Sequence, residues 1–430
     1  MRDLRSRIEN RDAKVVVVGQ GYVGLPLSLA AIDAGFRVVG IEVSDERVRS
    51  LKLGKSYISD CSDEQVELAL TRGFLPTSSF ADCEGFDVAI ITVPTPLLDG
   101  RPDMSYLEAA STSLAPYLTC GACVIVESTT YPGTTREFVR PILMAGSGLS
   151  EDDFLLGYSP ERVDPGIKDH RLETTPKIVS GLSSAASSVI EAFFGCFIEA
   201  VVVAETCEEA ELAKLLENTF RHVNIALINE LARFAHRLDI NVWRVVDLAS
   251  SKPFGFMPFF PGPGVGGHCL PIDPSYLSWR VEERLGEAFK FVHLANQING
   301  EMPSYVLERV GSMLEFHGKT MESALVVLLG LAYKANTSDW RESPTATLAE
   351  LLIDAGCDVK ICDPLVGRES AKRFADHMER LDVDLLRTAD ITVVMVGHDC
   401  FDRAMIAREA DLVLDTRNFL NGHDYRGSAL

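Results

Sequence analysis

One cysteine in a glycine- and proline-rich stretch is the strongest candidate for chemistry in this chain. Between Pro253 and Pro274 the sequence holds five glycines and six prolines, which excludes a continuous helix or strand. Glycines let the backbone approach a ligand closely, and prolines restrict the path between them. Cys269 lies near the end of this stretch, and Asp273 follows four residues later. A single thiol on a rigid loop is typical of a nucleophile, although a structural loop with an inert cysteine has the same composition.

A second candidate site lies near the start of the chain. The apolar run of residues 13–18 leads into Gly-Gln-Gly-Tyr-Val-Gly at 19–24, and a helical pattern follows as far as Ala34. The next strand-like run, Arg37–Glu42, ends in an acid. Gly-x-Gly-x-x-Gly alone is a weak signal, but between a strand and a helix, with this acid, it predicts a dinucleotide site. A pyrophosphate would bind at the helix N-terminus, and Glu42 would accept hydrogen bonds from the ribose and repel a 2′-phosphate, which favours NAD over NADP.

Two later loops are expected to line the nicotinamide half of that site. The strand-like runs Val88–Val93 and Val124–Glu127 lead into Val-Pro-Thr-Pro at 93–96 and into a Thr-rich segment at 128–135. In doubly wound sheets, ligands bind beyond the carboxyl ends of the strands. The alternative is that both segments are ordinary turns that open helices, because Thr and Pro are common at helix starts.

A long helix is predicted over Glu208–Leu238, which has no Gly or Pro and places apolar residues at three- and four-residue spacing. Its length suits a bridge between domains and a dimer interface. Lys214 and Asn218 are separated by four residues, so they share one face among apolar neighbours. Lys214 is either a functional amine on that face or a solvated surface lysine.

The last third of the chain returns to alternating strands and helices. Strand-like runs are found at 324–329, 358–362, 391–396 and 412–415, with a helix from Pro344 to about Gly356, but no glycine-rich phosphate loop. The expected fold is therefore α/β, with two Rossmann-like doubly wound domains joined by a central helical region. We place the domains at 1–205, 206–318 and 319–430, and expect a frayed tail after Asn421.

Composition limits the partners and the compartment. The chain has 430 residues, a net charge of −21 and 47% hydrophobic residues, but no apolar run long enough to span a membrane. The charge disfavours nucleic acids and anionic membranes as partners. A charged N-terminal segment without an apolar core predicts a cytoplasmic protein, where disulfides are rare. Ten cysteines are scattered, and the Cys120-x-x-Cys123 pair has no second pair at zinc spacing, so we expect no metal site.

The order of the motifs resembles one family, the nucleotide-sugar 6-dehydrogenases, which act on UDP-glucose, UDP-N-acetylglucosamine, UDP-N-acetylmannosamine or GDP-mannose. Besides the two glycine-rich segments and 93–96, the matching motifs are Ser-Thr-x-Tyr-Pro-Gly-Thr, Ser-Pro-Glu-Arg (159–162), Ala-Glu-Leu-Ala-Lys-Leu-x-Glu-Asn (210–218) and Gly-Leu-Ala-Tyr-Lys (330–334). The resemblance covers about residues 13–420. It implies an NAD-binding domain (1–205), a central helical dimerisation region with the cysteine loop (206–318) and an NDP-sugar domain (319–430).

The resemblance also implies a reaction, the four-electron oxidation of a sugar C6 alcohol to a uronic acid used in polysaccharide biosynthesis, with two NAD consumed in turn. Cys269 would form a thiohemiacetal that is oxidised to a thioester and hydrolysed, which explains why a thiol is needed to go beyond the aldehyde. Lys214 would stabilise the oxyanion with Asn218 beside it, Asp273 and Thr129 would position or activate water, and Glu161 would support that role.

Binding residues are assigned by the same resemblance. The cofactor set is Gly19, Gly21, Tyr22, Val23, Gly24, Glu42, Arg47, Val93, Thr95, Pro96, Thr129 and Arg341. The substrate set is Glu161, Arg162, Lys214, Asn218, Phe260, Gly262, Gly264, Gly266, Lys334 and Arg417. A homodimer through the central helix is implied, and a larger assembly stays open.

Two positions depart from UDP-glucose dehydrogenases. Pro165 stands where these enzymes often carry a second glutamate, and His268 replaces the serine before the thiol. The motifs are most similar to UDP-N-acetylglucosamine 6-dehydrogenases, with NDP-glucose (UDP or dTDP) as the second choice. Two rival functions are a two-electron hydroxyacid or sugar dehydrogenase and a catalytically silent NDP-sugar-binding protein. Cys269 and the third domain argue against the first rival, and the intact set of Cys269, Lys214, Asn218 and Asp273 argues against the second.

Overall fold

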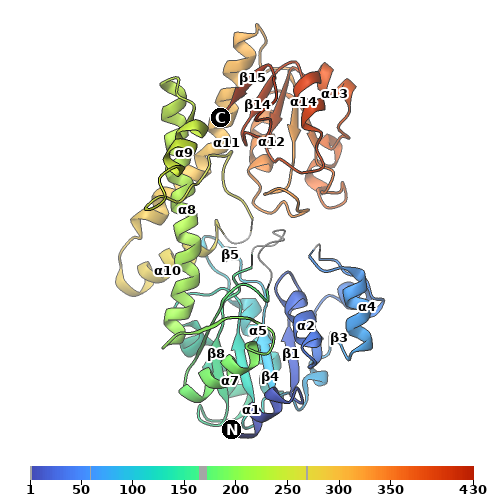
Figure 1. The fold of residues 1–430 in the computed structure, drawn as a ribbon, viewed down its shortest axis with the longest axis vertical. Coiled ribbons are helices and arrows are strands. Elements are labelled where there is room, and N and C mark those ends of the chain that lie inside the picture. The colour runs from blue at the N-terminus through green and yellow to red at the C-terminus, as the bar shows by residue number, and fades with distance from the viewer. Residues whose placement is uncertain (1, 59, 164–171, 268–269) are drawn as a thin grey trace. The chain divides into compact units, whose positions relative to one another are not determined.

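The computed structural model describes the chain except for residues 1, 59, 164–171 and 268–269 (Figure 1). Cys269, His268 and Pro165 therefore lie outside the described residues. The chain divides into two compact units. The first comprises Met1–Glu217 and Ser275–Gly286, and the second comprises Asn218–Pro274 and Glu287–Leu430.

The first unit is built on a twisted sheet whose described strands run in the order β10-β9-β8-β7-β4-β1-β2-β3. The strands are β1 (Lys14–Val18), β2 (Arg37–Ile41), β3 (Leu75–Thr77), β4 (Val88–Ile91), β7 (Cys123–Val126), β8 (Leu155–Tyr158), β9 (Lys177–Gly181) and β10 (Val201–Val203). Neighbouring strands are parallel, except that β8 and β9 are antiparallel, with Tyr158 opposite Ser180. The carboxyl ends of β1, β2, β4, β7 and β8 therefore share one edge.

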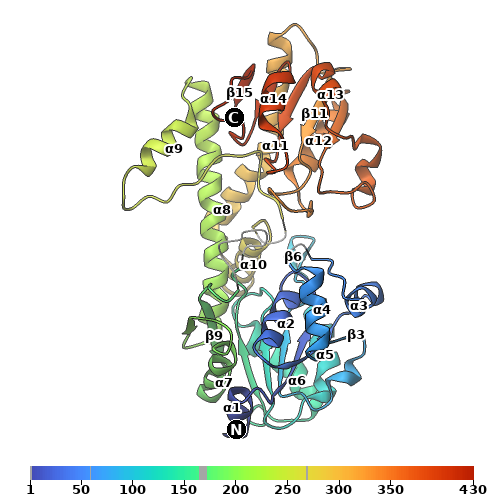
Figure 2. The ribbon, with the colours of Figure 1, turned by 45° about the vertical axis from the view of Figure 1, so that its right-hand side comes forward.

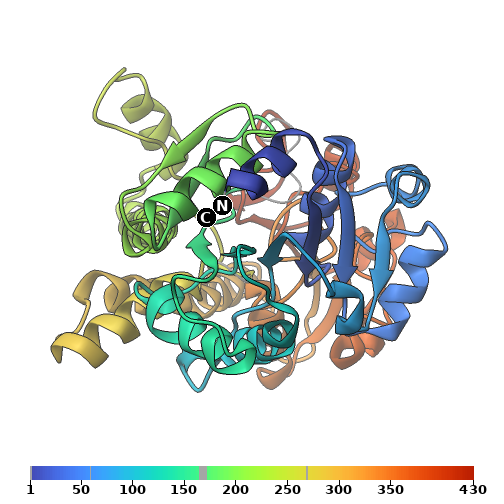
Figure 3. The ribbon, with the colours of Figure 1, turned by 90° about the horizontal axis from the view of Figure 1, so that it is seen from below.

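Helices cover both faces of this sheet, as Figure 3 shows from below. Alternate residues of β1 point to opposite sides, so Val15 and Val17 join one buried cluster and Val16 and Val18 the other. The first cluster packs against α1 (Arg2–Glu9), α2 (Gly24–Asp33), α4 (Asp63–Thr71) and α7 (Ser184–Phe194). The second packs against α5 (Ser105–Leu114) and α6 (Arg140–Ser147). Shorter elements are α3 (Asp45–Lys52), β5 (Leu97–Leu98), β6 (Arg101–Pro102) and the helical turns η1 (Phe80–Cys83), η2 (Ala115–Tyr117) and η3 (Thr134–Val139).

The central segment is helical, as predicted. Its longest element is α8 (Cys207–Arg237), which runs through 31 residues without a break (Figure 2). It is followed by α9 (Val242–Ser250), α10 (Asp273–Leu285) and α11 (Lys290–Phe316). The first turns of α8 bury Cys207 and Ala210 in the core of the first unit. A row of exposed apolar side chains follows the helix: Leu212, Leu216, Phe220, Leu227, Leu231, Phe234 and Leu238.

The second unit contains a parallel sheet with the described strand order β12-β11-β13-β14-β15. Its strands are β11 (Leu325–Leu329), β12 (Asp358–Cys362), β13 (Ile391–Val394), β14 (Val413–Asp415) and β15 (Gly427–Ala429). Helices α11 and α12 (Pro344–Asp354) and the turn η4 (Lys372–His377) pack on one face, and α13 (Val383–Thr388) and α14 (Arg403–Glu409) on the other.

The prediction of a frayed tail after Asn421 is wrong. Strand β15 pairs with β14, and the Leu430 N–H donates to the Asp415 carbonyl at 3.0 Å. Arg309 of α11 also donates to Ser428 Oγ at 2.7 Å. The tail is ordered because its backbone completes the sheet, a long-range contact that its polar composition does not indicate.

The observed architecture confirms the predicted fold class: two Rossmann-like domains joined by a central helical region with one long helix. Across the described helices, none combines the length and apolar character needed to cross a membrane.

Candidate active site

The glycine-rich loop after β1 has a distinct geometric reason for each glycine. Gly19 has φ 95°, a conformation that side chains rarely adopt. A Cβ at Gly24 would lie 1.8 Å from the Gly19 carbonyl oxygen, so only glycine lets α2 start this close to the strand. Nothing lies within 4 Å of a Cβ position at Gly21, and no side chain caps the N-terminus of α2 at Val23. The open position at Gly21, beside the N-terminus of α2, fits a dinucleotide pyrophosphate.

Glu42 lies directly after β2, where an acid for the adenosine ribose was predicted. Its carboxylate accepts hydrogen bonds from the N–H of Ser44 at 3.0 Å and of Gln20 at 3.4 Å. Arg47 lies 3.6 Å from the same carboxylate and covers the ring of Tyr57 at 5.1 Å. These contacts fix Glu42 at the carboxyl edge of the sheet. They also place beside it the cation of Arg47, which was predicted to bind NAD.

The predicted 93–96 loop is held by side chains from two other segments. Ser128 donates its hydroxyl to the Val93 carbonyl at 2.7 Å, and Tyr276 donates to the Pro96 carbonyl at 3.1 Å. Thr95 is buried between these anchors. The structure therefore brings the ends of β4 and β7 together at one edge of the sheet, as the order of the motifs predicted.

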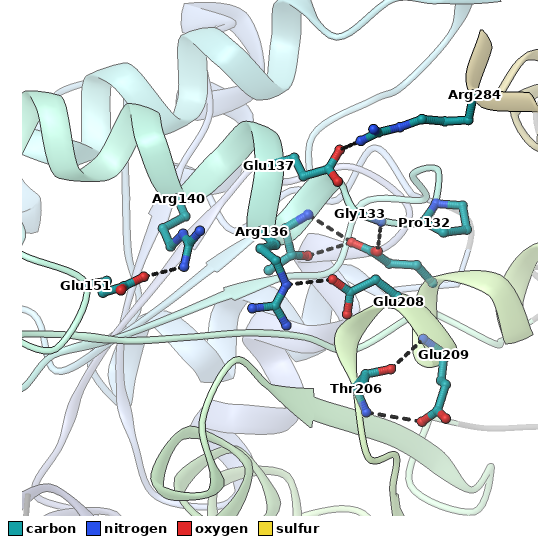
Figure 4. Close-up of polar contacts among 12 residues, drawn as sticks. Pro132, Gly133, Arg136, Glu137, Arg140, Glu151, Thr206, Glu208, Glu209 and Arg284 are labelled. Atoms are coloured by element: carbon teal, nitrogen blue, oxygen red, sulfur yellow. Dashed lines mark hydrogen bonds and ion pairs between the residues drawn. The ribbon is translucent and has the colours of Figure 1, made fainter.

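The segment 128–135 is anchored to α8 by a residue that the sequence analysis did not select. The buried carboxylate of Glu211 accepts hydrogen bonds from Gly133 N at 2.6 Å, Thr135 N at 2.9 Å and Thr135 Oγ1 at 2.7 Å. Burial raises the pKa of Glu211 to about 7, although these bonds oppose the rise. An ion pair between Arg136 and Glu208, 2.7 Å long, adds a second link (Figure 4).

Lys214 follows Glu211 by three residues, so both lie on the same face of α8. The face that carries Glu211 contacts the segment containing Thr129, which is itself partly buried. Lys214 is also partly buried, and its amine forms no hydrogen bond or ion pair with any described residue. Among the described residues, this cation therefore has no partner.

Glu161 follows β8, and its two carboxylate oxygens have different partners. Oε1 accepts hydrogen bonds from Arg162 N at 2.8 Å and Val163 N at 2.6 Å, while Oε2 pairs with Lys177 at 2.8 Å. Burial alone would raise the pKa of Glu161, but Lys177 and the hydrogen bonds outweigh it and lower the pKa to about 2. Lys177 also binds the buried Glu127. Lys177 and Glu127 are not among the residues predicted from the sequence; the available signal was a charged residue directly flanking an apolar strand.

Arg162, a predicted substrate residue, is held from two sides. Its Nη1 donates to the Pro176 carbonyl at 2.7 Å, and its Nη2 pairs with Glu217 of α8 at 2.7 Å. Glu161 and Arg162 are thus both fixed, one to the sheet and the other to the helix that carries Lys214.

In the second unit, Asn218 and Asp273 come together although 55 residues separate them in sequence. Asn218 donates from Nδ2 to the carboxylate of Asp273, and both residues are buried, at 9% and 3% exposure. Asp273 is the first residue of α10, a position that favours a carboxylate. The structure therefore joins two of the residues predicted to be catalytic.

The loop before Cys269 is packed too tightly for side chains at its glycines. A Cβ at Gly262 would lie 2.5 Å from the Arg417 guanidinium, and one at Gly266 would lie 2.4 Å from the Glu342 carbonyl oxygen. Gly264 has φ 129° and lies against Pro344. The predicted close approach of the backbone at these positions is thus a close approach to the second unit's own residues, and at Gly262 the group approached is the charged guanidinium of Arg417.

A buried amide network that sequence reasoning missed fixes this loop. Gly262 N donates to Asn229 Oδ1 at 2.9 Å, and Asn229 Nδ2 donates to Asn299 Oδ1 at 2.9 Å. Phe260 stacks on Trp243, with ring centroids 5.7 Å apart and planes 15° apart. Two asparagines at interior positions of long helices were the available signal, because asparagine is a poor helix former.

Arg417, also in the predicted substrate set, has only part of its guanidinium satisfied. Its Nε donates to the Met395 carbonyl at 2.9 Å, and its backbone N–H donates to Asp415 at 3.0 Å. Its two terminal nitrogens form no hydrogen bond with the described part of the chain. Burial lowers the pKa of Arg417 to about 10, with Asp415 opposing the shift. Of these nitrogens, Nη1 lies beside Gly262.

The remaining two predicted binding residues lie on the loop after β11. The ammonium of Lys334 lies 5.8 Å from the ring centroid of Tyr333. Arg341 is exposed and pairs with Asp339 through Nε at 3.0 Å and Nη2 at 2.6 Å. The Arg341 carbonyl also accepts a hydrogen bond from Gly267 N at 3.0 Å, so this loop and the glycine-rich loop are joined.

Three family models match successive parts of this chain. They describe the NAD binding domain (residues 13–197), the central domain (208–301) and the UDP binding domain (327–422) of the UDP-glucose/GDP-mannose dehydrogenase family. Together they cover well over half of the sequence.

Individual relatives match over nearly their whole length. A UDP-N-acetyl-D-mannosamine dehydrogenase of Pyrococcus horikoshii is 34% identical over 421 residues, covering 96% of this chain and 98% of the relative. A UDP-N-acetyl-D-glucosamine 6-dehydrogenase of Salmonella typhi is 36% identical over 393 residues, covering 91% of each. The solved structure of a UDP-D-ManNAc dehydrogenase from Pyrococcus horikoshii has a TM-score of 0.86 at 32% identity, covering 96% of this chain and 98% of that one.

Proposed function

Because the chain belongs to the UDP-glucose/GDP-mannose dehydrogenase family and is an NAD-dependent nucleotide-sugar 6-dehydrogenase, we propose that its substrate is a UDP-N-acetylhexosamine. UDP-N-acetylglucosamine is the first choice and UDP-N-acetylmannosamine the second, since both relatives described above act on such sugars. UDP- or dTDP-glucose is the further alternative. The product is the corresponding uronic acid.

The observation that carries the catalytic assignment is the buried hydrogen bond between Asn218 and Asp273. Asn218 lies one turn after Lys214 on α8, and Asp273 follows Cys269 by four residues. The bond therefore connects the helix that carries the amine to the loop that carries the thiol.

The chemistry assigns one task to each residue. Deprotonation of the C6 hydroxyl and loss of a hydride give the aldehyde, and the Cys269 thiolate then adds to that carbon to form a thiohemiacetal. Loss of a second hydride gives the thioester, and water cleaves it to the carboxylate and the free thiol. NAD bound at the 19–24 loop supplies the hydride acceptor in both oxidations, so two are used per sugar. Lys214, with Asn218 beside it, stabilises negative charge on the C6 oxygen.

Water for the last step is positioned by Asp273 and Thr129, with support from Glu161. A carboxylate near the acyl carbon accepts the proton that the attacking water loses. Glu161 lies at the carboxyl edge of the sheet and is held ionised by Lys177, which suits a group that orients water.

The nucleotide is proposed to bind in the second unit. Nη1 of Arg417, which forms no hydrogen bond with the described residues, lies beside Gly262, where a pyrophosphate would approach the backbone. Lys334 adds a further cation on the loop after β11. In a protein with a net charge of −21, such local cations are needed to hold a doubly charged ligand.

The row of exposed apolar residues on α8 is proposed to pack against a second copy of the chain. Its members lie three, four or seven residues apart, which keeps them on one helix face, and two of them, Leu216 and Leu238, are 62% and 69% exposed. A continuous apolar face of this length is unusual on a surface that remains in water.

A panel of UDP-, dTDP- and GDP-sugars, with NADH formation followed by absorbance, tests the proposal. We expect two NADH per sugar and the fastest turnover with UDP-N-acetylglucosamine. One NADH per sugar would support the two-electron alternative, and none with any sugar would support a silent binding protein. Cys269→Ser serves as the internal control, because it should still bind NAD while forming little uronic acid. Near-normal acid output from that variant would remove Cys269 from the mechanism.

A further inference from the structure

Three buried charged side chains form a group, Glu127–Lys177–Glu161, whose first two members have no part in the chemistry above. Lys177 binds Glu127 and lies 2.8 Å from Glu161 Oε2. The side chains of Lys177 and Glu127 are 3% and 0% exposed, and that of Glu161 is 15% exposed. Glu161 is thus the one member that reaches the surface.

Sheet topology explains why the three meet. Strands β8 and β9 are antiparallel with Tyr158 opposite Ser180, and continuing that register by three residues places Glu161 opposite Lys177. Glu127 follows β7, which pairs in parallel with β8. The group therefore lies at the carboxyl ends of β7 and β8, on the edge where open α/β sheets bind their ligands.

The charges of the group do not balance unless it holds a proton. Two ionised carboxylates and one ammonium would bury a net negative charge, which is costly. Burial raises the pKa of Glu127 to about 8, with Lys177 opposing and Glu161 adding to the rise. Burial would lower the pKa of Lys177, but both carboxylates outweigh it and raise the pKa. At neutral pH the proton is therefore on Glu127, while Glu161 stays ionised.

The described surroundings offer no other charge to compensate the group. From α7, the ring of Phe194 faces the Lys177 ammonium at 5.3 Å. From the segment after β8 and from α8, Arg162 and Glu217 pair with each other. Oε2 of Glu127 is buried and accepts no hydrogen bond from any described residue.

We propose that Lys177 and Glu127 are positioning residues for Glu161. Lys177 holds Glu161 oriented and ionised at the active-site edge, and Glu127 carries the proton that keeps the buried group neutral. Because no other described cation contacts Glu161, loss of Lys177 would let it take up a proton. The inference rests on the proposed function, in which Glu161 supports the activation of water.

The pH profile of kcat/KM separates this role from a merely structural one. In Lys177→Met, the acidic limb should move to higher pH by about 1 to 3 units, because an opposite charge at contact distance lowers a carboxyl pKa by that much. Lys177→Arg keeps the charge and should return the limb toward its original position. Arg7→Met is the matched control, since it breaks an ion pair with Asp87 in the same unit and should lower stability without moving the limb. An unmoved limb in a folded Lys177→Met, or an equal shift in Arg7→Met, would overturn the proposal.

A second measurement, infrared spectroscopy, needs neither enzyme turnover nor the Lys177→Met variant. Infrared spectra of the wild type should contain a band of a protonated buried carboxyl group that is lost near pH 8, beside the contribution of Glu211 that is lost near pH 7, and Glu127→Gln should lack only the component lost near pH 8. Glu127→Gln should keep near-normal activity at neutral pH, because the neutral amide replaces a neutral acid. A component lost near pH 8 that persists in Glu127→Gln would refute the assigned proton. If instead the wild type showed the expected band but oxidised no nucleotide sugar, the proposed function would be wrong, whereas the proton assigned to Glu127 in the buried group would be supported.

Discussion

Lys214 is a partly buried amine that forms no ion pair with a described anion. Taking an ammonium out of water without a partner is unfavourable, so its position is best explained by an anion that arrives with the substrate. In the proposed mechanism this anion is the C6 oxygen, which is charged in the transition state and neutral in the ground state. Lys214 should therefore contribute to turnover more than to binding of the substrate.

We expect Lys214→Ala to lower kcat by on the order of 10²-fold or more, as loss of an oxyanion donor does, with a smaller change in KM for the sugar. Steady-state kinetics on a variant shown to be folded by circular dichroism would measure both. Lys372→Ala, which removes an exposed lysine from η4, is the control and should leave both constants unchanged. An unchanged kcat in folded Lys214→Ala would make this residue an ordinary surface lysine.

At the scale of elements, α8 and the 128–135 segment act as one piece because Glu211 joins them. The carboxylate satisfies two backbone N–H groups and a hydroxyl that would otherwise be buried without partners. The same contact sets the distance between the helix carrying Lys214 and the segment carrying Thr129. A structural residue thus determines the placement of two residues that are proposed to be functional.

Replacing Glu211 with Gln should destabilise the protein by about 1 to 3 kcal/mol, because the amide nitrogen cannot accept the hydrogen bond from Gly133 or Thr135. Glu208→Gln, which removes only the half-exposed ion pair with Arg136, should cost less than about 1 kcal/mol. Urea unfolding of the two variants gives the comparison. Equal losses would show that the Glu211 contacts contribute no more than a surface pair.

The pKa of Glu211 also predicts in which direction the free energy of unfolding changes with pH. The folded-state pKa of Glu211, about 7, lies above its ordinary value of 4.5. Its contribution to stability is therefore fully present below about pH 4.5 and lost as the pH rises through 7. Over that window the wild type should lose more stability than Glu211→Gln, which has no proton to release there.

At the scale of the whole molecule, the apolar row on α8 predicts how copies of the chain associate. Exposing Leu231 and Phe234 to water in every molecule would be unfavourable, and pairing two copies removes them from water. Leu231→Glu/Phe234→Glu should therefore convert a dimer to a monomer in light scattering after gel filtration. Phe316→Glu changes an 86% exposed phenylalanine outside the row and should leave the mass unchanged. A wild type that is already monomeric would contradict the assignment of this face.

Local patterns in the sequence were sufficient for the elements and for part of the site. The glycine spacing at 19–24, the acid at Glu42 and the unbroken run of α8 each depend on neighbours within a few turns, where backbone geometry follows directly from residue type. The order of the motifs also placed Val93, Thr129 and Glu161 at strand ends, because parallel strands present their carboxyl ends at one edge.

The tertiary structure alone decided which side chains meet. Lys177 binds Glu127 across 50 residues, and Asn218 reaches Asp273 across 55, through strand and helix pairings that no local pattern encodes. The same reason accounts for the amide network at Asn229 and for the ordered tail, whose strand β15 is stabilised by β14 rather than by its own composition. Buried polar groups depend on partners far along the chain, so their roles become readable only when the fold has brought those partners into contact.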